Sequence, residues 1–322
     1  MLSLCPINLF AMLDTFKNLT ELLQYFKDEA TCREYLAQKR WGGKPTCPYC
    51  KHDKVYNIEN GKRYKCANPK CYKKFSVTVN SIFEDTNISL QKWFTAIYLC
   101  TSHKKGISSI QLAKDIGVSQ KTAWHLEHRI REMLKVKEPI VLKGTVEADE
   151  TYVGGKESNK HKHKRVTKAG TAGKIAMLGL VERGGKVYAQ RIVSPSKEFI
   201  APVLTKYIEF GSNLHTDEWS AYTEVGEKHY KHATVKHKLK IYVDGDVTTN
   251  TIEGFWAILK RGLYGIYHYA SAKHIDRYLD EFCARYNTRK LGEVERFDHF
   301  LEKCSDTTLT WDRLVNTPLQ LY

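Results

Sequence analysis

Three acidic residues are spaced along the chain so that their carboxylates could meet at one site. Asp149 follows the apolar run "TVEA", Asp217 ends the run "LHTD", and Glu253 opens an amphipathic segment after a gap of 35 residues. Hard cations such as Mg2+ prefer oxygen ligands, and two ions about 4 Å apart can stabilise both oxygens of a phosphoryl transfer. Because a single acid is usually a solvated surface residue, the prediction depends on the elements that would bring the three together.

The pattern around these acids predicts a mixed sheet with helices packed on its faces. The expected order is three strands, helix, strand, helix, strand, helix. After Asp149 this order places strands at 175–181 and 187–193, a helix at 197–210, strands at 214–217 and near 234–235, and a helix from Asn250. Gly184 and Gly185 would form a hairpin turn. In open α/β sheets the site lies beyond the strand ends, where Asp149 and Asp217 are expected.

The last helix should present Glu253 and Lys260 on one face. Its apolar residues recur at helical spacing and are expected to face the core: Ile252, Trp256, Leu259 and Leu263. Glu253 and Lys260 fall on another stripe, since positions three and four apart stack on one face. Glu253 could then reach a metal while Lys260 meets a DNA phosphate, although a solvated lysine is an equal alternative. Asn250 would be the helix cap.

Four cysteines have the spacing of a structural zinc site. Cys47 and Cys50 form a CxxC pair, and Cys66 and Cys71 form a second pair with a wider loop. Two such pairs make a closed tetrahedral Zn2+ site that contributes folding energy. Free structural cysteines or two disulfides are the lesser alternative, because no secretory signal is evident and cytosolic thiols stay reduced. The other five are expected to be ordinary thiols: Cys5, Cys32, Cys100, Cys283 and Cys304.

The segment around these cysteines is basic and aromatic. From Lys39 to Lys74 it holds eleven Lys or Arg residues against Asp53 and Glu59, with tyrosines interspersed. Cations contact phosphates and aromatic rings pack on sugars or bases, so this ribbon is expected to touch DNA. A protein-binding ribbon is the open alternative, because a basic surface is not specific.

A helix-turn-helix pattern follows. A helix is predicted from Ser89 to Ser102, and the later segment "ISSIQLAKDIGVSQKTAWHLEHRIREML" has two helices separated at Gly117, the second capped by Ser119. The second helix of this motif enters the major groove with its N-terminal residues nearest the bases. The candidates for DNA contact are therefore Gln120, Lys121 and Thr122, with Arg129 further along.

Composition agrees with a DNA-binding protein of two to three domains. The chain has 322 residues, a net charge of +15, a pI near 9.2 and 42% apolar residues. No apolar stretch is long enough to span a bilayer, so a membrane partner is not expected and the protein is placed in the cytoplasm on the nucleoid. Residues 156–174 hold seven Lys or Arg, which predicts either a DNA-clamping loop or a solvated hairpin tip.

The segments "VEADETYVGGK", "HTDEWSAY" and "TNTIEGFWAILKRGLYGIYH" resemble the catalytic blocks of bacterial insertion-sequence DDE transposases with an N-terminal zinc ribbon. The resemblance implies a ribonuclease H-like catalytic core, with the family's acids at Asp149, Asp217 and Glu253 and its trailing lysine at Lys260. It further implies two Mg2+ ions, for which Mn2+ can substitute, with Asp149 bridging both. The implied activity is cleavage at the terminal inverted repeats, followed by strand transfer that joins the cut ends to target DNA. The resemblance also implies that a homodimer or higher oligomer carries out these steps.

The expected fold is therefore multidomain α+β. A helical lead-in (1–40) precedes the zinc ribbon (41–80), the helix-turn-helix region (81–140), the catalytic domain (141–290) and a C-terminal tail (291–322). Two alternatives stay open. A nuclease or resolvase of the same fold would lack strand transfer, and a transposase-derived DNA-binding regulator would bind DNA without catalysis.

Overall fold

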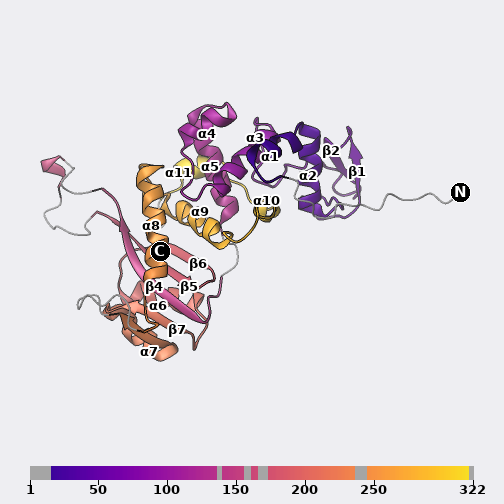
Figure 1. Ribbon diagram of the computed structural model, residues 1–322. Coiled ribbons are helices and arrows are strands. Elements are labelled where there is room, and N and C mark those ends of the chain that lie inside the picture. Colours follow the sequence, from indigo (N-terminus) through magenta and orange to yellow (C-terminus); the bar gives the residue numbers. More distant parts are fainter. Residues whose placement is uncertain (1–15, 136–139, 156–160, 166–172, 236–244, 319–322) are drawn as a thin grey trace. The chain divides into compact units, whose positions relative to one another are not determined.

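The computed structural model describes residues 16–135, 140–155, 161–165, 173–235 and 245–318 (Figure 1). The chain divides into two compact units. One holds residues up to Ser102 together with Leu112–Met133 and Lys290–Leu309, and the other holds the remainder, including Leu134–Arg289. Among the described helices, none is both long and apolar enough to cross a membrane.

The second unit contains a five-stranded mixed sheet with the order β6-β5-β4-β7-β8. The first three strands in the chain are antiparallel neighbours, and the last two run parallel to β4. Their bounds are Thr145–Val153 (β4), Ile175–Glu182 (β5), Val187–Ile192 (β6), Asn213–Asp217 (β7) and Lys231–Val235 (β8). The strand and helix order expected from the sequence is confirmed, and the sheet is mixed, as predicted.

Helices cover both faces of this sheet (Figure 1). One face packs against α6 (Lys197–Tyr207), the 3-10 turn η3 (Ser220–Tyr222) and α7 (Thr223–His229). The other face packs against α8 (Asn250–Gly265) and α9 (Ile275–Asn287). The sheet therefore has two cores, one on each side.

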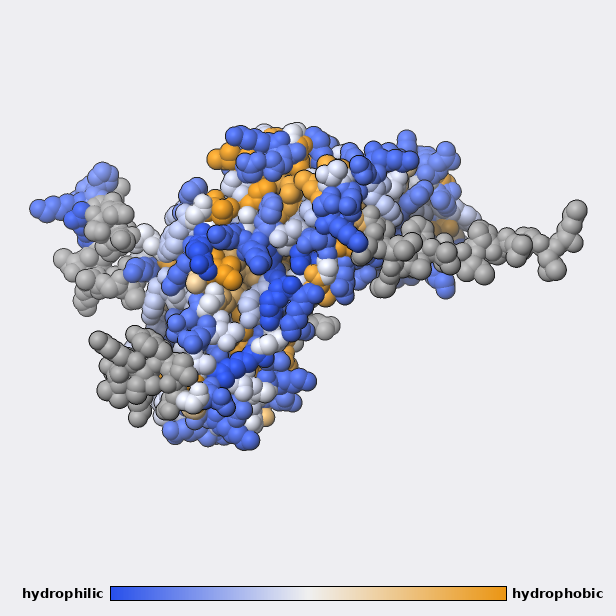
Figure 2. All heavy atoms as spheres, in the orientation of Figure 1, coloured by the Kyte–Doolittle hydropathy of each residue, from blue (hydrophilic) through white to orange (hydrophobic). Residues whose placement is uncertain are grey.

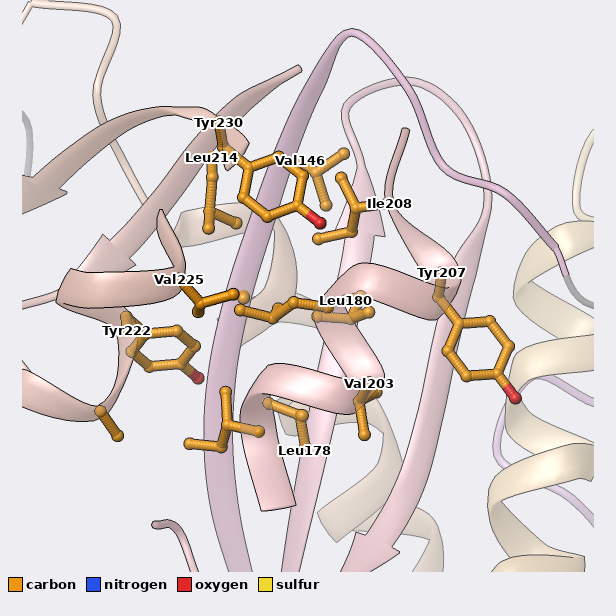
Figure 3. Close-up of a cluster of buried hydrophobic side chains, with 14 of the residues drawn as sticks. Val146, Leu178, Leu180, Val203, Tyr207, Ile208, Leu214, Tyr222, Val225 and Tyr230 are labelled. Carbon is orange, nitrogen blue, oxygen red and sulfur yellow. The ribbon is translucent and has the colours of Figure 1, made fainter. Parts of the chain in front are cut away.

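Alternation along β4 assigns its side chains to these two cores. Val146 joins the α6 side, where it lies beside Leu214, Ile208 and Tyr230 (Figure 3). Because successive strand residues point to opposite faces, Glu147 and Asp149 lie on the α8 side. Strand β4 thus presents Glu147 and Asp149 on the face that packs against α8, the helix that carries Glu253.

Two element bounds differ from the expectation. Strand β4 continues to Val153 instead of ending at Asp149, because it pairs with β5 as far as Val153 and Ile175. Helix α6 ends at Tyr207 instead of residue 210. The backbone of Ile208 is extended and forms a β-bridge with Leu142. The backbone of Leu142 donates to the carbonyl of Tyr207 and accepts the N–H of Glu209.

The first unit is built on helices and an aromatic core. Its helices include α1 (Leu19–Tyr25), α2 (Glu29–Trp41), α3 (Leu90–Ser102) and α10 (Glu293–Leu301), followed by the turn η5 (Glu302–Cys304). Rings from Phe16, Phe26, Phe94 and Phe297 contact one another at centroid distances of 4.8 to 5.9 Å. The segment expected to be a C-terminal tail thus includes a helix that supplies part of this core. A short helix, α11 (Trp311–Asn316), follows in the chain and belongs to the second unit.

The ribbon in the same unit is a three-stranded antiparallel sheet of β1 (Val55–Ile58), β2 (Arg63–Cys66) and β3 (Lys74–Phe75). Arg40, at the end of α2, secures the segment after it: its guanidinium donates to the carbonyls of Val79 at 3.1 Å and Asn80 at 3.3 Å. The half-buried guanidinium of Arg40 thus joins the end of α2 to the segment that follows the ribbon.

The expected helix-turn-helix is present as α4 (Ser109–Ile116) and α5 (Gln120–Leu134). Gly117 has φ +62°, the left-handed conformation that ends a helix most readily with glycine. The backbone N–H of Val118 returns to the carbonyl of Ala113 at 3.0 Å. Ser119 then caps α5 by accepting the backbone N–H of Thr122 at 3.2 Å.

Candidate functional site

Strand register brings Asp149 and Asp217 to the same level of the sheet. The parallel ladder pairs Thr145 with Asn213 and Glu147 with His215. Continuing that register by two residues puts Asp149 opposite Asp217, the last residue of β7. Parallel partners point to the same face, so both carboxylates lie on the α8 side of the sheet.

Helix α8 adds Glu253 and Lys260 to this group. The helix packs through Ile252 and Trp256, which are buried, so the stripe that carries Glu253 turns away from the core. Burial, followed by the carboxylates of Asp217 and Glu253, raises the pKa of Asp149 to about 7, while Lys260 opposes that rise. Asp217, Glu253 and Lys260 are therefore each within electrostatic range of Asp149.

Two of the acids are held by short local hydrogen bonds. Asp217 accepts the backbone N–H of Trp219 at 2.9 Å, which folds the chain back just after β7. Glu253 accepts the hydroxyl of Thr249 at 3.0 Å, one helical turn earlier. Thr249, and not Asn250 as expected, is the residue before the helix, so the prediction that Asn250 caps α8 is wrong.

A further acid, Glu150, lies beside the group but faces the other side of the sheet. Burial and the charges of Asp149 and Asp217 raise the pKa of Glu150 to about 7, against the effect of the fully buried Tyr222 beside it. Adjacent strand residues alternate, so Glu150 belongs to the α6 side. Sequence reasoning passed over it.

Sequence reasoning also missed Glu147, which is completely buried. It accepts hydrogen bonds from Arg183 and from the first turn of α8, including the backbone N–H of Thr251 at 2.8 Å. The one sequence signal that could have flagged Glu147 is a glutamate inside the predicted strand segment "TVEAD". Glutamate is almost never buried without partners, so a glutamate at such a position needs a specific role.

The four ribbon cysteines form a compact thiol group. Their sulfur atoms all lie within 4.8 Å of one another. Cys47 Sγ is 3.8 Å from Cys71 Sγ, and Cys50 Sγ is 3.5 Å from Cys66 Sγ. Among the residues that the structure describes, these four cysteines are the one group of three or more His, Cys, Asp or Glu side chains whose ligand atoms lie close enough together to hold a metal ion. Four thiolates in this arrangement suit tetrahedral Zn2+.

The backbone of both knuckles is shaped for this group. Lys51 and Tyr72, each directly after the second cysteine of a pair, have positive φ values of 59° and 48°. The backbone N–H of Asn68 points at Cys66 Sγ, 3.4 Å away. The wider loop of the second pair therefore still closes as a knuckle.

The surface of the ribbon carries cations packed on aromatic rings. Lys73 Nζ lies 4.6 Å from the ring centre of Tyr49, and Lys65 Nζ lies 5.2 Å from that of Tyr72. Tyr49 and Tyr72 are about half exposed, and the face of the ribbon seen in Figure 2 is largely hydrophilic. Such pairs can present charge and a flat ring to one ligand.

The candidate DNA residues of α5 have different surroundings. Gln120 and Lys121 are exposed, and Thr122 is half-buried beside the Ser119 cap. Arg129 is buried: it donates to the carbonyl of Glu84 at 2.6 Å, and its guanidinium lies over the ring of Trp93. An arginine used inside the fold in this way is a poor candidate for DNA contact, so we remove Arg129 from the set.

Most of the basic insertion expected to clamp DNA lies outside the described residues. The 3-10 turn η2 (Lys162–Lys164) and the residues on either side of it are described, with the rings of His161 and His163 stacked 5.8 Å apart.

Comparisons with known proteins identify the class. Residues 141–287 match the ISXO2-like transposase domain family, and residues 27–74 match the transposase zinc-ribbon domain family. Over 258 residues the chain is 30% identical to an uncharacterised protein of the transposable element ISH50 from Halobacterium salinarum, covering 75% of this chain and 85% of that protein. The chain therefore belongs to the ISXO2-like transposase family with an N-terminal zinc ribbon, and it is an enzyme of DNA phosphoryl transfer.

Solved structures give only distant matches. The Mos1 strand transfer complex aligns with a TM-score of 0.30 and 14% identity, over 67% of this chain and 78% of that one. A simian T-cell lymphotropic virus intasome aligns with a TM-score of 0.26 and 14% identity, over 52% of this chain and 60% of that one.

Proposed function

We propose that this transposase binds the terminal inverted repeats of its element and uses Asp149, Asp217 and Glu253 to hold two Mg2+ ions at the reacting phosphate. The observation that carries the proposal is the electrostatic grouping of these acids with Lys260. A partly buried acid whose pKa is raised, with other charged side chains beside it, is typical of catalytic sites. The class of reaction is hydrolysis of a phosphodiester to free a 3′ hydroxyl, followed by attack of that hydroxyl on a target phosphodiester.

The donor set fits a hard divalent cation. Carboxylate oxygens are the ligands that Mg2+ prefers. Burial, and after it the charges of Asp217 and Glu253, raise the pKa of Asp149, and a bound cation would offset both effects. Bound Mg2+ would supply charge stabilisation at the attacking and leaving oxygens.

Each side chain has a separate task. Asp149, central on β4, would reach both ion positions, and Asp217 and Glu253 would each complete one. Lys260, two helical turns after Glu253, would bind a phosphate oxygen and orient the DNA strand. The chain offers no convincing nucleophile and base pair of the Ser, Tyr or Cys type among its expected site residues, so water and the 3′ hydroxyl are the nucleophiles proposed.

DNA recognition is assigned to the first unit. Gln120, Lys121 and Thr122 lie at the start of α5, the position from which a recognition helix reads base edges. The ribbon adds cations on aromatic rings, which suits contact with the sugar-phosphate backbone. Zn2+ held by Cys47, Cys50, Cys66 and Cys71 would keep that surface folded. Pairing of two DNA ends calls for a dimer or higher assembly.

The test is strand transfer on a labelled duplex carrying the element's end, with Mg2+, Mn2+ or EDTA. Wild type should produce metal-dependent joined product, and Glu253→Gln should lose it. Glu224→Gln is the matched control, because Glu224 is an exposed acid paired with Lys197 on α6. Equal joining by Glu253→Gln and wild type would refute the assigned role of Glu253.

The same assay separates the two alternatives. Metal-dependent cleavage without joined product would indicate a nuclease or resolvase. Tight binding of the end with no product under any metal would indicate a DNA-binding regulator. The negative charges of Asp217 and Glu253 near Asp149 favour catalysis over the regulator, since a binding module has no need for acids that repel the Asp149 carboxylate.

A further inference from the structure

Glu147 is a buried carboxylate with every oxygen position occupied. Its side chain has no exposed surface. One oxygen accepts Arg183 Nε at 2.8 Å and the hydroxyl of Thr251 at 2.9 Å, and the other accepts the backbone N–H groups of Thr251 at 2.8 Å and Ile252 at 3.1 Å. A buried charge is tolerated only with such complete pairing, so Glu147 has a defined structural task.

That task is to cap helix α8 from the neighbouring strand. The first N–H groups of a helix lack partners within the helix, and a negative charge is favourable at that end. In most helices the residue before the first turn supplies the cap, but Thr249 makes no such bond here. Glu147 does so from β4, and the hydroxyl of Thr249 donates to Glu253.

Arg183 extends the same contact to the segment that leads into α8. Besides Glu147 it binds the carbonyls of Asp246 at 2.7 Å and Thr248 at 3.1 Å. The nitrogen that donates to Thr248, Nη2, also lies 3.2 Å from Nδ1 of His215, the residue paired with Glu147 across the sheet.

The position of Glu147 ties this cap to the candidate site. Glu147 is two residues before Asp149 on the same strand and the same face, so a fixed strand geometry separates the two carboxylates. Glu253 is one residue after Ile252, which Glu147 binds. Strand β4 therefore carries Asp149, an acid of the site, and also Glu147, the carboxylate that fixes the start of α8. Helix α8 in turn carries Glu253, another acid of the site.

We propose that Glu147, with Arg183, is a positioning residue that sets Glu253 against Asp149 for metal binding. The inference rests on the proposed function of these acids. Outer contacts that orient metal ligands commonly change metal affinity by about 10 to 100-fold when removed. Glutamine at 147 would direct an NH2 group toward the N–H donors of α8, so at least one donor would lose its partner.

The first measurement is Mn2+ binding to the full-length protein, followed by electron paramagnetic resonance without DNA. Glu147→Gln should weaken Mn2+ binding by about 10 to 100-fold. Asp276→Asn is the matched control, because Asp276 likewise joins the first turn of a helix, α9, to a strand by accepting the N–H of Arg191 at 3.0 Å. This control should lower thermal stability and leave Mn2+ affinity unchanged.

A double-mutant cycle distinguishes positioning from general loosening of the fold. If Glu147 acts through Glu253, then Glu147→Gln should weaken Mn2+ binding no further in a Glu253→Gln background. An equal loss in both backgrounds, or unchanged binding in Glu147→Gln alone, would overturn the inference. Should Glu147→Gln fail to fold, Arg183→Lys applies the same test, since lysine keeps a cation beside Glu147 but cannot make all the carbonyl contacts.

The proposed function fails separately. Wild type that binds no Mn2+, or binds it as tightly after Asp149→Asn, would remove the metal site and the inference with it. Wild type that binds Mn2+ through Asp149 while Glu147→Gln binds equally well would remove only the inference. Both results are read from the spectrum, without an activity assay.

Discussion

The indole ring of Trp256 occupies the space in which a side chain at Gly179 would lie. A Cβ atom built at Gly179 would be 2.4 Å from Cζ2 of Trp256, far inside contact distance. Gly179 is also the residue directly across from Asp149 in the β4 and β5 ladder. Helix α8 therefore approaches the sheet at the very rung that carries Asp149.

Gly179→Ala should accordingly push α8 away from the sheet. Overpacking of a well-filled core costs about 1 to 3 kcal/mol, and the shift would also move Glu253 relative to Asp149. We expect a lower free energy of unfolding in urea and reduced strand transfer. Gly265→Ala is the control, because nothing lies within 4 Å of a Cβ built there.

A second substitution tests the cause. Gly179→Ala combined with Trp256→Phe gives the added methyl group room, so the double variant should recover stability relative to the sum of the single changes. Simple additivity of the two losses would show that the ring and the glycine do not conflict.

The acids and cysteines could be found from the sequence because local pattern determines them. Asp217 ends a short apolar run, Glu253 begins a helical stripe, and the cysteine spacing is set by the knuckles. The alignment of Asp149 with Asp217 follows from the register of β4 and β7, whose paired residues are 68 positions apart in the chain, and no local sequence pattern records that register.

Long-range contacts explain what the sequence could not give. Glu147 is a core residue because partners from Arg183 and α8 meet it, and neither is near it in the chain. Phe297 belongs to the aromatic core of the first unit although it follows the catalytic unit in the chain. Arg129 looked like a DNA ligand by charge and position, but its carbonyl acceptor, Glu84, is 45 residues away.

The raised pKa of Asp149 predicts how stability depends on pH. Its folded pKa is about 7, above the unfolded value of about 3.9. The metal-free folded protein therefore holds a proton that the unfolded chain has lost, and its free energy of unfolding should fall as pH rises from about 4 to about 7. Asp149→Asn removes that cost and should be more stable than wild type by roughly 1 to 3 kcal/mol at pH 8 in EDTA.

Urea unfolding in EDTA at pH 5.5 and pH 8 checks this result. The advantage of Asp149→Asn should shrink at the lower pH, where the wild-type carboxyl keeps its proton. Glu218→Gln, at an exposed acid beside Asp217, serves as the control and should show no such gain. An equal effect of Asp149→Asn at both pH values would contradict the assignment.

Loss of zinc should affect the ribbon specifically. Cys66→Ser removes a buried thiol from the four-sulfur group, so bound zinc should fall from about one ion per chain to nearly none. The ribbon should then unfold and DNA affinity should drop. Elemental analysis and anisotropy with labelled duplex measure the two effects. Cys283→Ala, a buried thiol in the core beside α8, should keep its zinc.

Lys121 and Arg129 should separate DNA binding from stability, although both are cations on α5. Lys121 is exposed near the start of the helix, whereas Arg129 binds the carbonyl of Glu84 and lies over Trp93. Lys121→Gln should weaken DNA binding and reduce the slope of log affinity against log salt by about one, with unchanged melting. Arg129→Gln should lower stability by about 1 to 3 kcal/mol and leave the slope unchanged. The opposite pattern would return Arg129 to the DNA-contact set, because a side chain that releases phosphate counterions cannot be engaged wholly within the fold.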